Sequence, residues 1–255
     1  SEWRASDRGL FPEFGDQRLG TARKICNKAV TARGEGWLSV EEAREVLAAA
    51  GLTVSPGGVA STPDEAVRIA DEVGYPVAIK LASLEIVHKT EIGGVVLGLE
   101  SAEGVRGAFE HIRQRLDEDD RSDAMQGVLV QPMIEPAAEI MIGVEDDPAF
   151  GPVIAFGLGG IHVEILRDVA FRVSPLTDLD ASAMVRAVRG HKLLEGYRGH
   201  PAADTAALEE ALLRLSRLVE AVPEISEIDL NPIFAFGPDE GYNVVDARIR
   251  VKGQS

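Results

Sequence analysis

Residues 76–94 have the sequence PVAIKLASLEIVHKTEIGG, and the rest of the chain is organised around them. A short run rich in Val and Ile predicts a buried β-strand, and it is interrupted by one charged residue, Lys80. A buried lysine needs an anion as its partner. His88, Lys89 and the pair Gly93–Gly94 follow directly, so two cations and a titratable ring belong to a segment that glycine makes flexible. The pattern predicts a phosphate-binding lid.

The composition is that of an ordinary globular protein, with 45% hydrophobic and 27% charged residues among 255. That length permits one large domain or two modest ones. No apolar segment approaches the ~20 residues of a membrane span, and the N-terminal sequence lacks the apolar run of a signal peptide. The single cysteine, Cys26, fits a small core residue on a helix better than a reactive thiol. These features predict a cytoplasmic protein with no membrane partner.

The net charge is strongly negative, because 26 Lys and Arg stand against 42 Asp and Glu, which gives −16. A nucleic-acid backbone would be repelled by this mean field, so no nucleic-acid partner is expected. A small phosphate ligand is compatible with it if local cations and a divalent metal neutralise the ligand. The clustering of Lys80, His88 and Lys89 is therefore a stronger indication of a phosphate-binding site.

Helix caps and strand patterns divide the chain into α and β segments. Residues 1–19 show no clean period and predict a poorly ordered arm or one that docks on a partner. Capping-box signatures at Ser39 and Thr62 predict helices that end at Gly51 and Gly74. Further helices are expected at 20–33, 101–116, 177–189 and 204–221, and strands at 95–99, 127–133, 139–144, 153–156, 161–166, 169–173 and 225–234. The connection at 134–136 is expected to be a hinge, and the acidic run at 117–120 a solvated loop rather than a metal site.

The glycine-rich segment Gly157–Gly160 is bounded by predicted strands on both sides. A dinucleotide-binding fingerprint needs a helix to follow its glycines, so that interpretation fails. A backbone nest near a phosphate and a tight antiparallel turn fit the pattern equally well.

Polar residues alternate with apolar ones near the C-terminus. Glu227, Asp229 and Asn231 share one face of a predicted strand, and Asp246 ends the next apolar run. Carboxylate and amide oxygens are the ligands that Mg²⁺ prefers, with nucleotide phosphates and water completing an octahedron. Alternation alone favours solvent-facing residues of an amphipathic strand, so both interpretations stay open.

Several blocks of sequence occur in a fixed order along the chain: Val77–Lys80, His88–Val95, Val130–Met133, Glu139–Val144, Asp147–Pro152, Phe156–Gly160, Asp168–Arg172, Leu193–Gly199 and Glu227–Pro232. Together they resemble the ATP-grasp subunit of the ADP-forming acyl-CoA synthetases, which are relatives of the succinyl-CoA synthetase β subunit. The resemblance extends from about residue 20 to residue 252. Its number of ordered blocks, rather than any single block, makes it specific.

The resemblance implies an α+β fold of the ATP-grasp type, with two α+β lobes and a nucleotide held between them. An N-terminal arm and helix would occupy residues 1–36 and the ATP-grasp domain residues 37–252. Its first lobe would comprise roughly residues 37–125 and its second lobe roughly residues 126–252.

The resemblance also implies roles for individual residues. Lys80 is similar to the lysine that contacts the nucleotide phosphates. The lid residues Lys89, Gly93 and Gly94 would close over the phosphates, and Gly159 and Gly160 would border the transferred phosphoryl group. The hinge that reads adenine through backbone groups would comprise Gln131, Pro132, Met133 and Ile134. Glu139 is similar to the acid near the ribose, Asn231 and Asp246 to the Mg²⁺ ligands, and Asp229 to an acid that orients a phosphohistidine.

His88 resembles a second histidine that shuttles the phosphoryl group in some members of the family; the alternative is that it only binds phosphate. A neutral imidazole nitrogen is a competent nucleophile near pH 7, which suits the first role. Arg172 is expected either to contact phosphate or to form an ordinary surface ion pair.

The reaction implied is acyl-CoA + ADP + phosphate ⇌ carboxylic acid + CoA + ATP, through an acyl phosphate and a phosphohistidine. In the family, a CoA-binding α subunit carries the principal phosphohistidine, which implies an αβ or α₂β₂ assembly. An acyl-CoA-sensing regulatory module and a carboxylate–amine ligase are the alternatives. Intact Lys80, His88, Asn231 and Asp246 favour a working phosphotransfer site over the sensor. The resemblance leaves open the acid substrate and the choice between ATP and GTP.

Overall fold

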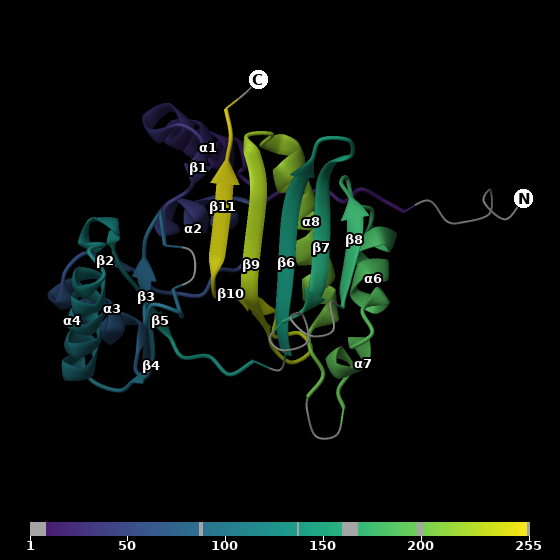
Figure 1. Ribbon diagram of the computed structural model, residues 1–255. Coiled ribbons are helices and arrows are strands. Elements are labelled where there is room, and N and C mark those ends of the chain that lie inside the picture. Colours follow the sequence, from purple (N-terminus) through teal and green to yellow (C-terminus); the bar gives the residue numbers. More distant parts are fainter. Residues whose placement is uncertain (1–8, 87–88, 137, 160–167, 198–200, 254–255) are drawn as a thin grey trace, which may run out of the picture. The chain divides into compact units, whose positions relative to one another are not determined.

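The computed structural model describes residues 9–86, 89–136, 138–159, 168–197 and 201–253, which form two compact units (Figure 1). Unit 1 contains the chain up to Gly36, then Glu45–Val54, and then the chain from Pro136 onward. Unit 2 contains Trp37–Arg44 and Ser55–Glu135. The chain of unit 2 is therefore inserted into that of unit 1.

Unit 2 is built on a four-stranded sheet with the strand order β2-β5-β3-β4, in which each neighbouring pair is antiparallel. Its strands are β2 (Gly58–Ala60), β3 (Val77–Ala82), β4 (Val95–Leu99) and β5 (Gly127–Pro132), and its helices include α3 (Pro63–Val73), α4 (Ala102–Glu118) and the 3₁₀ helix η2 (Ser122–Ala124). The helices α3 and α4 bury Ile69 and Phe109 in a core that Ile79 and Val130 of the sheet complete. Strand β5 pairs with β2 and β3, so unit 2 runs past residue 125, where the sequence placed the end of the first lobe.

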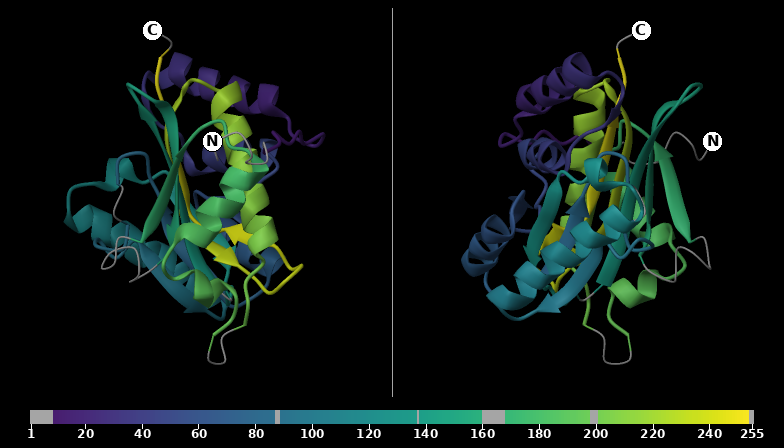
Figure 2. Two further views of the ribbon diagram at one scale, coloured as in Figure 1. Left: turned by 90° about the vertical axis from the view of Figure 1, so that its right-hand side faces the viewer. Right: turned by 60° about the vertical axis from the view of Figure 1, so that its left-hand side comes forward.

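Unit 1 holds a seven-stranded sheet with the order β1-β11-β9-β6-β7-β8, and β10 pairs with β9. The strands are β1 (Gly36–Trp37), β6 (Ala138–Asp147), β7 (Gly151–Leu158), β8 (Val169–Val173), β9 (Ile225–Ala235), β10 (Tyr242–Val244) and β11 (Ala247–Val251). The helices are α1 (Leu19–Arg33), α6 (Asp178–Ala187), α7 (His191–Leu194) and α8 (Thr205–Ala221), and α2 (Val40–Ala49) continues from unit 2 into unit 1. Helices α6 and α8 lie on one face of the sheet, as the rotated views show (Figure 2). The α+β fold class is confirmed.

The alternation of apolar residues explains which face the helices cover. Residues such as Ile142, Ile154 and Ile228, on β6, β7 and β9, are fully buried. Because successive side chains of a strand point to opposite faces, these residues share the face that packs on the helices. Helix α8 contributes Leu208, Leu212, Leu215 and Val219, which are all buried, as its sequence period predicts.

Both predicted capping signatures begin helices. The Ser39 hydroxyl accepts from the Glu42 amide at 3.2 Å, and the Glu42 carboxylate accepts from the Ser39 amide at 2.8 Å. The Thr62 hydroxyl accepts a hydrogen bond from the Glu65 amide at 3.2 Å, and the Glu65 carboxylate accepts one from the Ser61 amide at 2.8 Å. The hydroxyls of Ser39 and Thr62 thus satisfy the Glu42 and Glu65 amides, which the helix N-termini leave without an internal partner, and this is why these short sequences fix the helix starts.

The described part of the N-terminal arm docks on unit 1 of its own chain, which differs from the expectation of a poorly ordered arm or a partner-bound one. The Leu10 amide donates to the Asp178 carboxylate at 2.7 Å, and the Asp178 amide donates to the Leu10 carbonyl at 3.0 Å. Asp16 forms an ion pair with Arg214 at 2.9 Å, and the guanidinium lies 4.3 Å from the centre of the Phe14 ring. The hydrogen bond from Arg214 lowers the pKa of Asp16 from its usual value.

No helix in the described ranges is long and apolar enough to cross a membrane.

Candidate functional site

Lys80 lies in the middle of β3, in unit 2, and only 8% of the residue is exposed. Its neighbours Ile79 and Leu81 belong to the core beneath the helices, so Lys80 points to the opposite face of the sheet. Gln131, which is 1% exposed, lies opposite Ala78 on β5 and therefore shares that face as a diagonal neighbour of Lys80. The predicted buried strand is confirmed, with Lys80 buried on it, and two predicted site residues, Lys80 and Gln131, lie on the same face of the sheet.

The segment that follows β3 folds back on that strand. The Leu81 amide donates to the carbonyl of Gly94 at 2.7 Å, and the Gly94 amide donates to the carbonyl of Lys89 at 2.7 Å. Lys89 is buried, and Gly93 has the positive φ of 72° that glycine tolerates best. Residues 89–94 thus form a closed turn at the end of the lysine strand, and the predicted site residue His88 lies outside the described residues.

The turn depends on a missing side chain at Gly94. A Cβ atom there would lie 2.9 Å from the Lys89 carbonyl oxygen and 3.1 Å from Cβ of Leu81. We expect Gly94→Ala to lower the free energy of unfolding by about 1–3 kcal/mol, because the backbone must shift to relieve the contact. Gly107→Ala is the matched control, since a Cβ on this exposed position of α4 meets nothing within 4 Å. It should be neutral or stabilising by up to about 1 kcal/mol. Urea denaturation measures both, and equal midpoints for the two variants would contradict the assignment.

The predicted hinge begins on β5. Pro132 lies opposite Val77, and the Met133 amide donates to the carbonyl of Pro76 at 2.9 Å. Met133 is exposed and Ile134 is half-buried, and unit 2 ends directly afterwards at Glu135. The hinge position therefore coincides with the passage of the chain from unit 2 to unit 1, while adenine recognition there stays a prediction.

In unit 1, the two predicted metal ligands are neighbours. Strands β9 and β11 pair with Leu230 opposite Ala247, so Asn231 and Asp246 occupy adjacent places at the end of this ladder. The Asn231 amide donates to the Asp246 carbonyl at 3.2 Å, and the Asp246 carboxylate accepts from the Ala247 amide at 3.0 Å. The sequence pattern predicted that both residues lie on adjacent strands; Asn231 lies on β9, whereas Asp246 lies in the connection between β10 and β11.

The donor chemistry of this pair fits a hard cation. An amide oxygen and a carboxylate are both suitable for Mg²⁺, which usually takes only one or two protein carboxylates and completes its shell with phosphate oxygens and water. Among the described residues, no group of three or more His, Cys, Asp and Glu side chains could hold a metal ion. The oxygen donors of Asn231 and Asp246 are therefore compatible with Mg²⁺, and their role as metal ligands stays a prediction.

Asp229 lies two residues before Asn231 on the same face of β9, and its carboxylate accepts from Arg248 of β11 at 2.8 Å. Both side chains of this ion pair are 29% exposed. The pair fixes the direction of the carboxylate while leaving it accessible, which suits the predicted role of orienting a histidine. Arg248 was missed in the sequence, because the pairing of β9 with β11 is needed to place it there.

Glu139 and Gly159 meet at the ends of β6 and β7. The Gly159 amide donates to the Glu139 carbonyl at 2.7 Å, and a Cβ on Gly159 would lie 3.0 Å from Cβ of Glu139. The close approach of the two backbones explains the glycine at this place. The Glu139 side chain is exposed, and the predicted site residue Gly160 lies outside the described residues.

Comparison with known families matches residues 29–251 to the ATP-grasp domain. The chain belongs to the ATP-grasp family. This ATP-grasp chain is 43% identical to the β subunit of ADP-forming acetate–CoA ligase II of Pyrococcus furiosus, over 92% of its own length and 99% of that subunit. It is 37% identical to ADP-forming 4-hydroxybutyrate–CoA ligase of Nitrosopumilus maritimus, where 98% of the chain corresponds to 35% of the relative. The predicted resemblance to ADP-forming acyl-CoA synthetases is confirmed.

Solved structures of acetyl-coenzyme A synthetase 1 from Ca. Korarchaeum cryptofilum have the same fold as this ATP-grasp chain. One, a complex with coenzyme A, Ca-AMPCP and HgCl⁺, has a TM-score of 0.85 at 39% identity, and the match covers 91% of this chain and all of that chain. Another, with coenzyme A and Mg-AMPPCP, has a TM-score of 0.78 at 38% identity over the same shares, and its phosphohistidine segment points towards the nucleotide binding site. The ATP-grasp fold predicted from the sequence is thereby confirmed.

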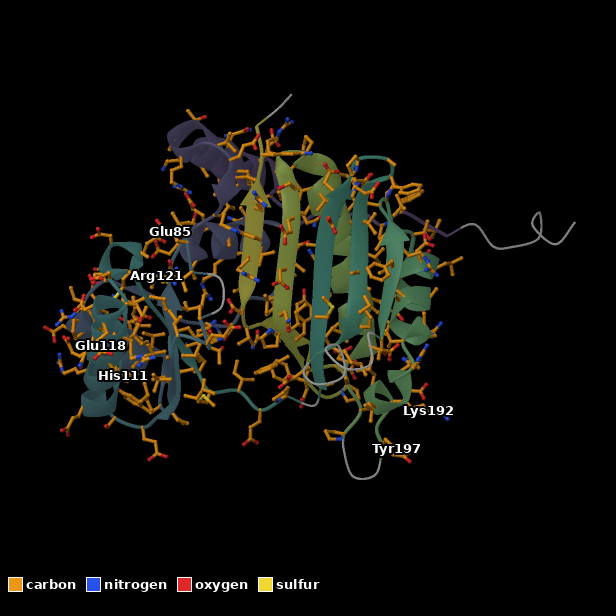
Figure 3. The ribbon with its side chains drawn as sticks, in the orientation of Figure 1. Glu85, His111, Glu118, Arg121, Lys192 and Tyr197 are labelled. Carbon is orange, nitrogen blue, oxygen red and sulfur yellow. The ribbon has the colours of Figure 1, made fainter. Side chains whose placement is uncertain are left out.

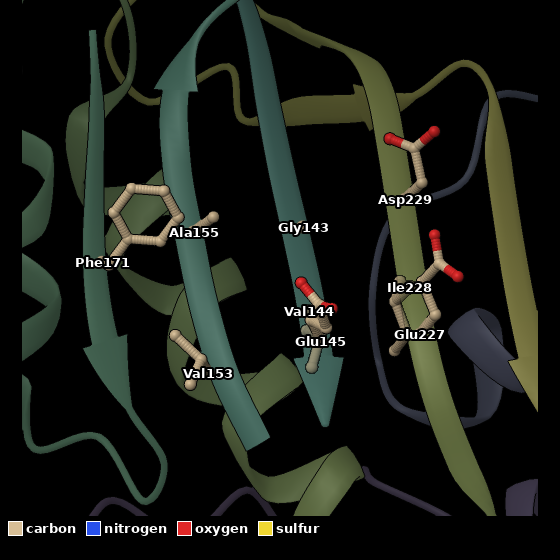
Figure 4. A pocket seen from close by; sticks show the side chains of 9 residues that line it. All are labelled: Gly143, Val144, Glu145, Val153, Ala155, Phe171, Glu227, Ile228 and Asp229. Carbon is tan, nitrogen blue, oxygen red and sulfur yellow. The ribbon is translucent and has the colours of Figure 1, made fainter. Parts of the chain in front are cut away.

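Two features of the ATP-grasp chain were not predicted. The buried Asp168 carboxylate accepts from the amides of Arg189 and Gly190 at 2.7 and 2.8 Å and so anchors the start of α7. A pocket of about 320 Å³ lies on the sheet of unit 1, and its lining includes Phe171 (Figure 4). The sequence signal for it was that the apolar residues Phe171 and Val173 stand on either side of the charged Arg172. Arg172, between them, is exposed and donates to the carbonyl of Phe171 at 2.8 Å.

Proposed function

We propose that this chain is the nucleotide-binding phosphotransfer subunit of an ADP-forming acyl-CoA synthetase and acts with a CoA-binding partner subunit in an αβ or α₂β₂ assembly. The net reaction is acyl-CoA + ADP + phosphate ⇌ carboxylic acid + CoA + ATP. The observation that carries the proposal is the 43% identity to an ADP-forming acetate–CoA ligase β subunit over 99% of that subunit. The chain would act in the cytoplasm, on ATP and ADP rather than on nucleic acid.

The residues of unit 2 would bind the nucleotide. Lys80 and Lys89 would place positive charge beside the phosphates, and both are buried, so their charges act at low dielectric. The turn that ends at Gly93 and Gly94 would close over the phosphates, with backbone amides as further donors. The backbone groups of Gln131–Ile134 would bind the base, and Glu139 of unit 1 would accept a hydrogen bond from the ribose.

The residues of unit 1 would serve the transfer itself. Asn231 and Asp246 would hold Mg²⁺, which neutralises phosphate charge when it is bound. Asp229, held by Arg248, would orient the imidazole of the partner's phosphohistidine, and Gly159 and Gly160 would leave room for the transferred phosphoryl group. We propose that His88 relays the phosphoryl group.

The function is tested by mixing the chain with the CoA-binding subunit encoded nearest to it in the genome. Acyl-CoA thioesters of different chain length are then screened with MgADP and phosphate. The expected result is formation of ATP together with an equal amount of free CoA, in a reaction that requires both proteins. ADP and GDP are compared in parallel to identify the nucleotide. A chain that binds acyl-CoA or nucleotide but yields no ATP with this subunit would instead be the regulatory sensor.

A further inference from the structure

Two of the proposed site residues meet where strand β7 ends. Leu158, the last residue of β7, lies opposite Ile140 of β6, and the amide of the next residue, Gly159, donates to the Glu139 carbonyl at 2.7 Å. A Cβ atom on Gly159 would lie 3.0 Å from Cβ of Glu139, so the two backbones approach closely. The place of Gly159 therefore depends on how firmly the end of β7 is held.

A buried carboxylate, that of Asp168, fixes a segment next to this end of the strand. Only 7% of Asp168 is exposed, and its two oxygens accept from the amides of Arg189 and Gly190 at 2.7 and 2.8 Å. Removing a carboxylate from water costs free energy unless hydrogen bonds replace its hydration, which the two amides do here. Both amides precede α7, a helix of only four residues. The carboxylate thus holds the backbone at Gly190 rather than a long helix.

Gly190 packs directly on Leu158. A Cβ atom on Gly190 would overlap Cδ1 of Leu158, so this methyl group occupies the space that any larger residue would need. Leu158 is only 4% exposed and is therefore enclosed on its other sides as well. Because protein interiors are closely packed, a shift of the backbone at Gly190 would move Leu158 and, with it, the next residue, Gly159.

Asp168 also borders β7 through its own backbone. Gly157 of β7 lies opposite Val169, the residue after Asp168, in the ladder of β7 with β8. A Cβ atom on Gly157 would lie 3.1 Å from the Asp168 carbonyl oxygen. The backbone of Asp168 therefore lies close to Gly157, while its side chain holds the segment that packs on Leu158. Asp168 constrains the end of β7 from two directions.

We propose that Asp168 is a positioning residue for phosphoryl transfer, which keeps Gly159 in its place beside Glu139 and next to the transferred group. It acts through Gly190 and Leu158 and touches neither the nucleotide nor the metal. The proposal rests on the proposed function, since it concerns the same reaction.

The test compares kcat for ATP formation by Asp168→Asn and wild-type chains, each with the CoA-binding subunit encoded nearest to it. Asparagine presents one oxygen and one NH₂ group, so one of the two backbone amides would face a donor. We expect kcat to fall by about tenfold or more, because small misplacements in a transfer site slow the reaction strongly. The dissociation constant of MgADP, measured by calorimetry, should be unchanged, since Lys80 and the Asn231–Asp246 pair are not disturbed.

Asp180→Asn is the matched control. The Asp180 carboxylate also accepts from the backbone at a helix start, from the Thr177 amide at 3.0 Å. That helix, α6, follows Val173, which is at the opposite end of β8 from Asp168. Rates are measured well below the melting temperature of every variant. A purely stabilising role would leave kcat the same in both variants, whereas positioning lowers it only in Asp168→Asn.

Hydrogen–deuterium exchange of the free chain tests the path of contacts without turnover. The Gly159 amide is hydrogen-bonded to Glu139 and should exchange slowly in the wild type. It should exchange faster in Asp168→Asn and in Gly190→Ala, a second variant that keeps the carboxylate but displaces Leu158. Gly190→Ala should also lower kcat, by a smaller factor, because the flexible leucine side chain absorbs part of the displacement. Mass spectrometry of peptides that cover residues 153–159 provides the measurement.

A kcat of Asp168→Asn equal to that of Asp180→Asn overturns the proposal, as does unchanged exchange at Gly159 in both Asp168→Asn and Gly190→Ala. Weaker binding of MgADP with an unchanged kcat also overturns it, because Asp168 would then serve nucleotide binding. If Asp168→Asn does not fold, Gly190→Ala decides by the same measurements. A wild-type chain that makes no ATP with the subunit contradicts the proposed function, and the exchange at Gly159 then decides the positioning role by itself.

Discussion

Replacing Lys80 with methionine is expected to lower the rate of ATP formation from acyl-CoA, ADP and phosphate by about 10²–10³-fold, the usual loss when one charge-stabilising group is removed from a phosphoryl or acyl transfer site. The lysine is buried on a strand whose other face packs in the core of unit 2. Its charge is therefore weakly screened by water, and its loss is felt strongly by a phosphate nearby. Methionine retains an unbranched side chain of similar length, whereas Lys80→Ala, with the same expected loss of turnover, would also leave a cavity.

The variant is assayed with the CoA-binding subunit under saturating substrates, and its melting curve is recorded beside that of the wild type. Lys192→Met serves as the control, because Lys192 is an exposed lysine on α7 (Figure 3). It should retain the full rate. A nearly normal rate in Lys80→Met, with an unchanged melting temperature, would remove Lys80 from the phosphate site and weaken the proposed function as a whole.

Replacing Asp246 with asparagine is expected to raise the Mg²⁺ concentration that supports half-maximal binding of ADP by about tenfold or more, because the only carboxylate of the Asn231–Asp246 pair is lost. Asparagine can still accept the hydrogen bond from the Ala247 amide, so the turn between β10 and β11 should survive. Turnover should fall by orders of magnitude at physiological Mg²⁺.

Binding is followed by calorimetric titration of ADP at a series of Mg²⁺ concentrations, without the partner subunit, so that the readout does not depend on turnover. Asp239→Asn is the control, since Asp239 is exposed in the β9–β10 turn with a φ of 66° that asparagine also adopts. The Mg²⁺ dependence of this control should match that of the wild type. An Asp246→Asn chain with the same dependence would show that the metal is held elsewhere.

Local patterns were sufficient to predict most elements of the fold. Ser39 and Thr62 begin helices because each accepts a hydrogen bond from an amide three residues ahead, which the sequence alone specifies. The lysine strand was predictable for the same reason, since Val77–Ala82 is a short run with a single charge. Asn231 and Asp246 lie close in the sequence and are joined by a short excursion of the chain, so their proximity could be expected as well.

Features that depend on distant pairing could not be predicted. Phe171 comes to lie in one row with Asp229 only because β8, β7, β6 and β9 are neighbours in that order. The docking of the arm depends on the ion pair between Asp16 and Arg214, which are 198 residues apart. The assignment of β5 to unit 2 likewise follows from its ladder with β3, and a sequence pattern contains no information about which strand is its neighbour.

The insertion of one unit into the other sets the order in which the two can be completed on the ribosome. All residues of unit 2 have been synthesised once Glu135 has been added, so its sheet and helices can assemble as a local unit. Unit 1 can be completed only later, because α1 is held by the ion pair of Arg23 with Glu224, which follows 201 residues later in the chain. Its central strand β6 likewise requires β9, which is synthesised about 80 residues afterwards. The inserted unit is thus finished first, and unit 1, which combines segments from before and after it in the sequence, closes last.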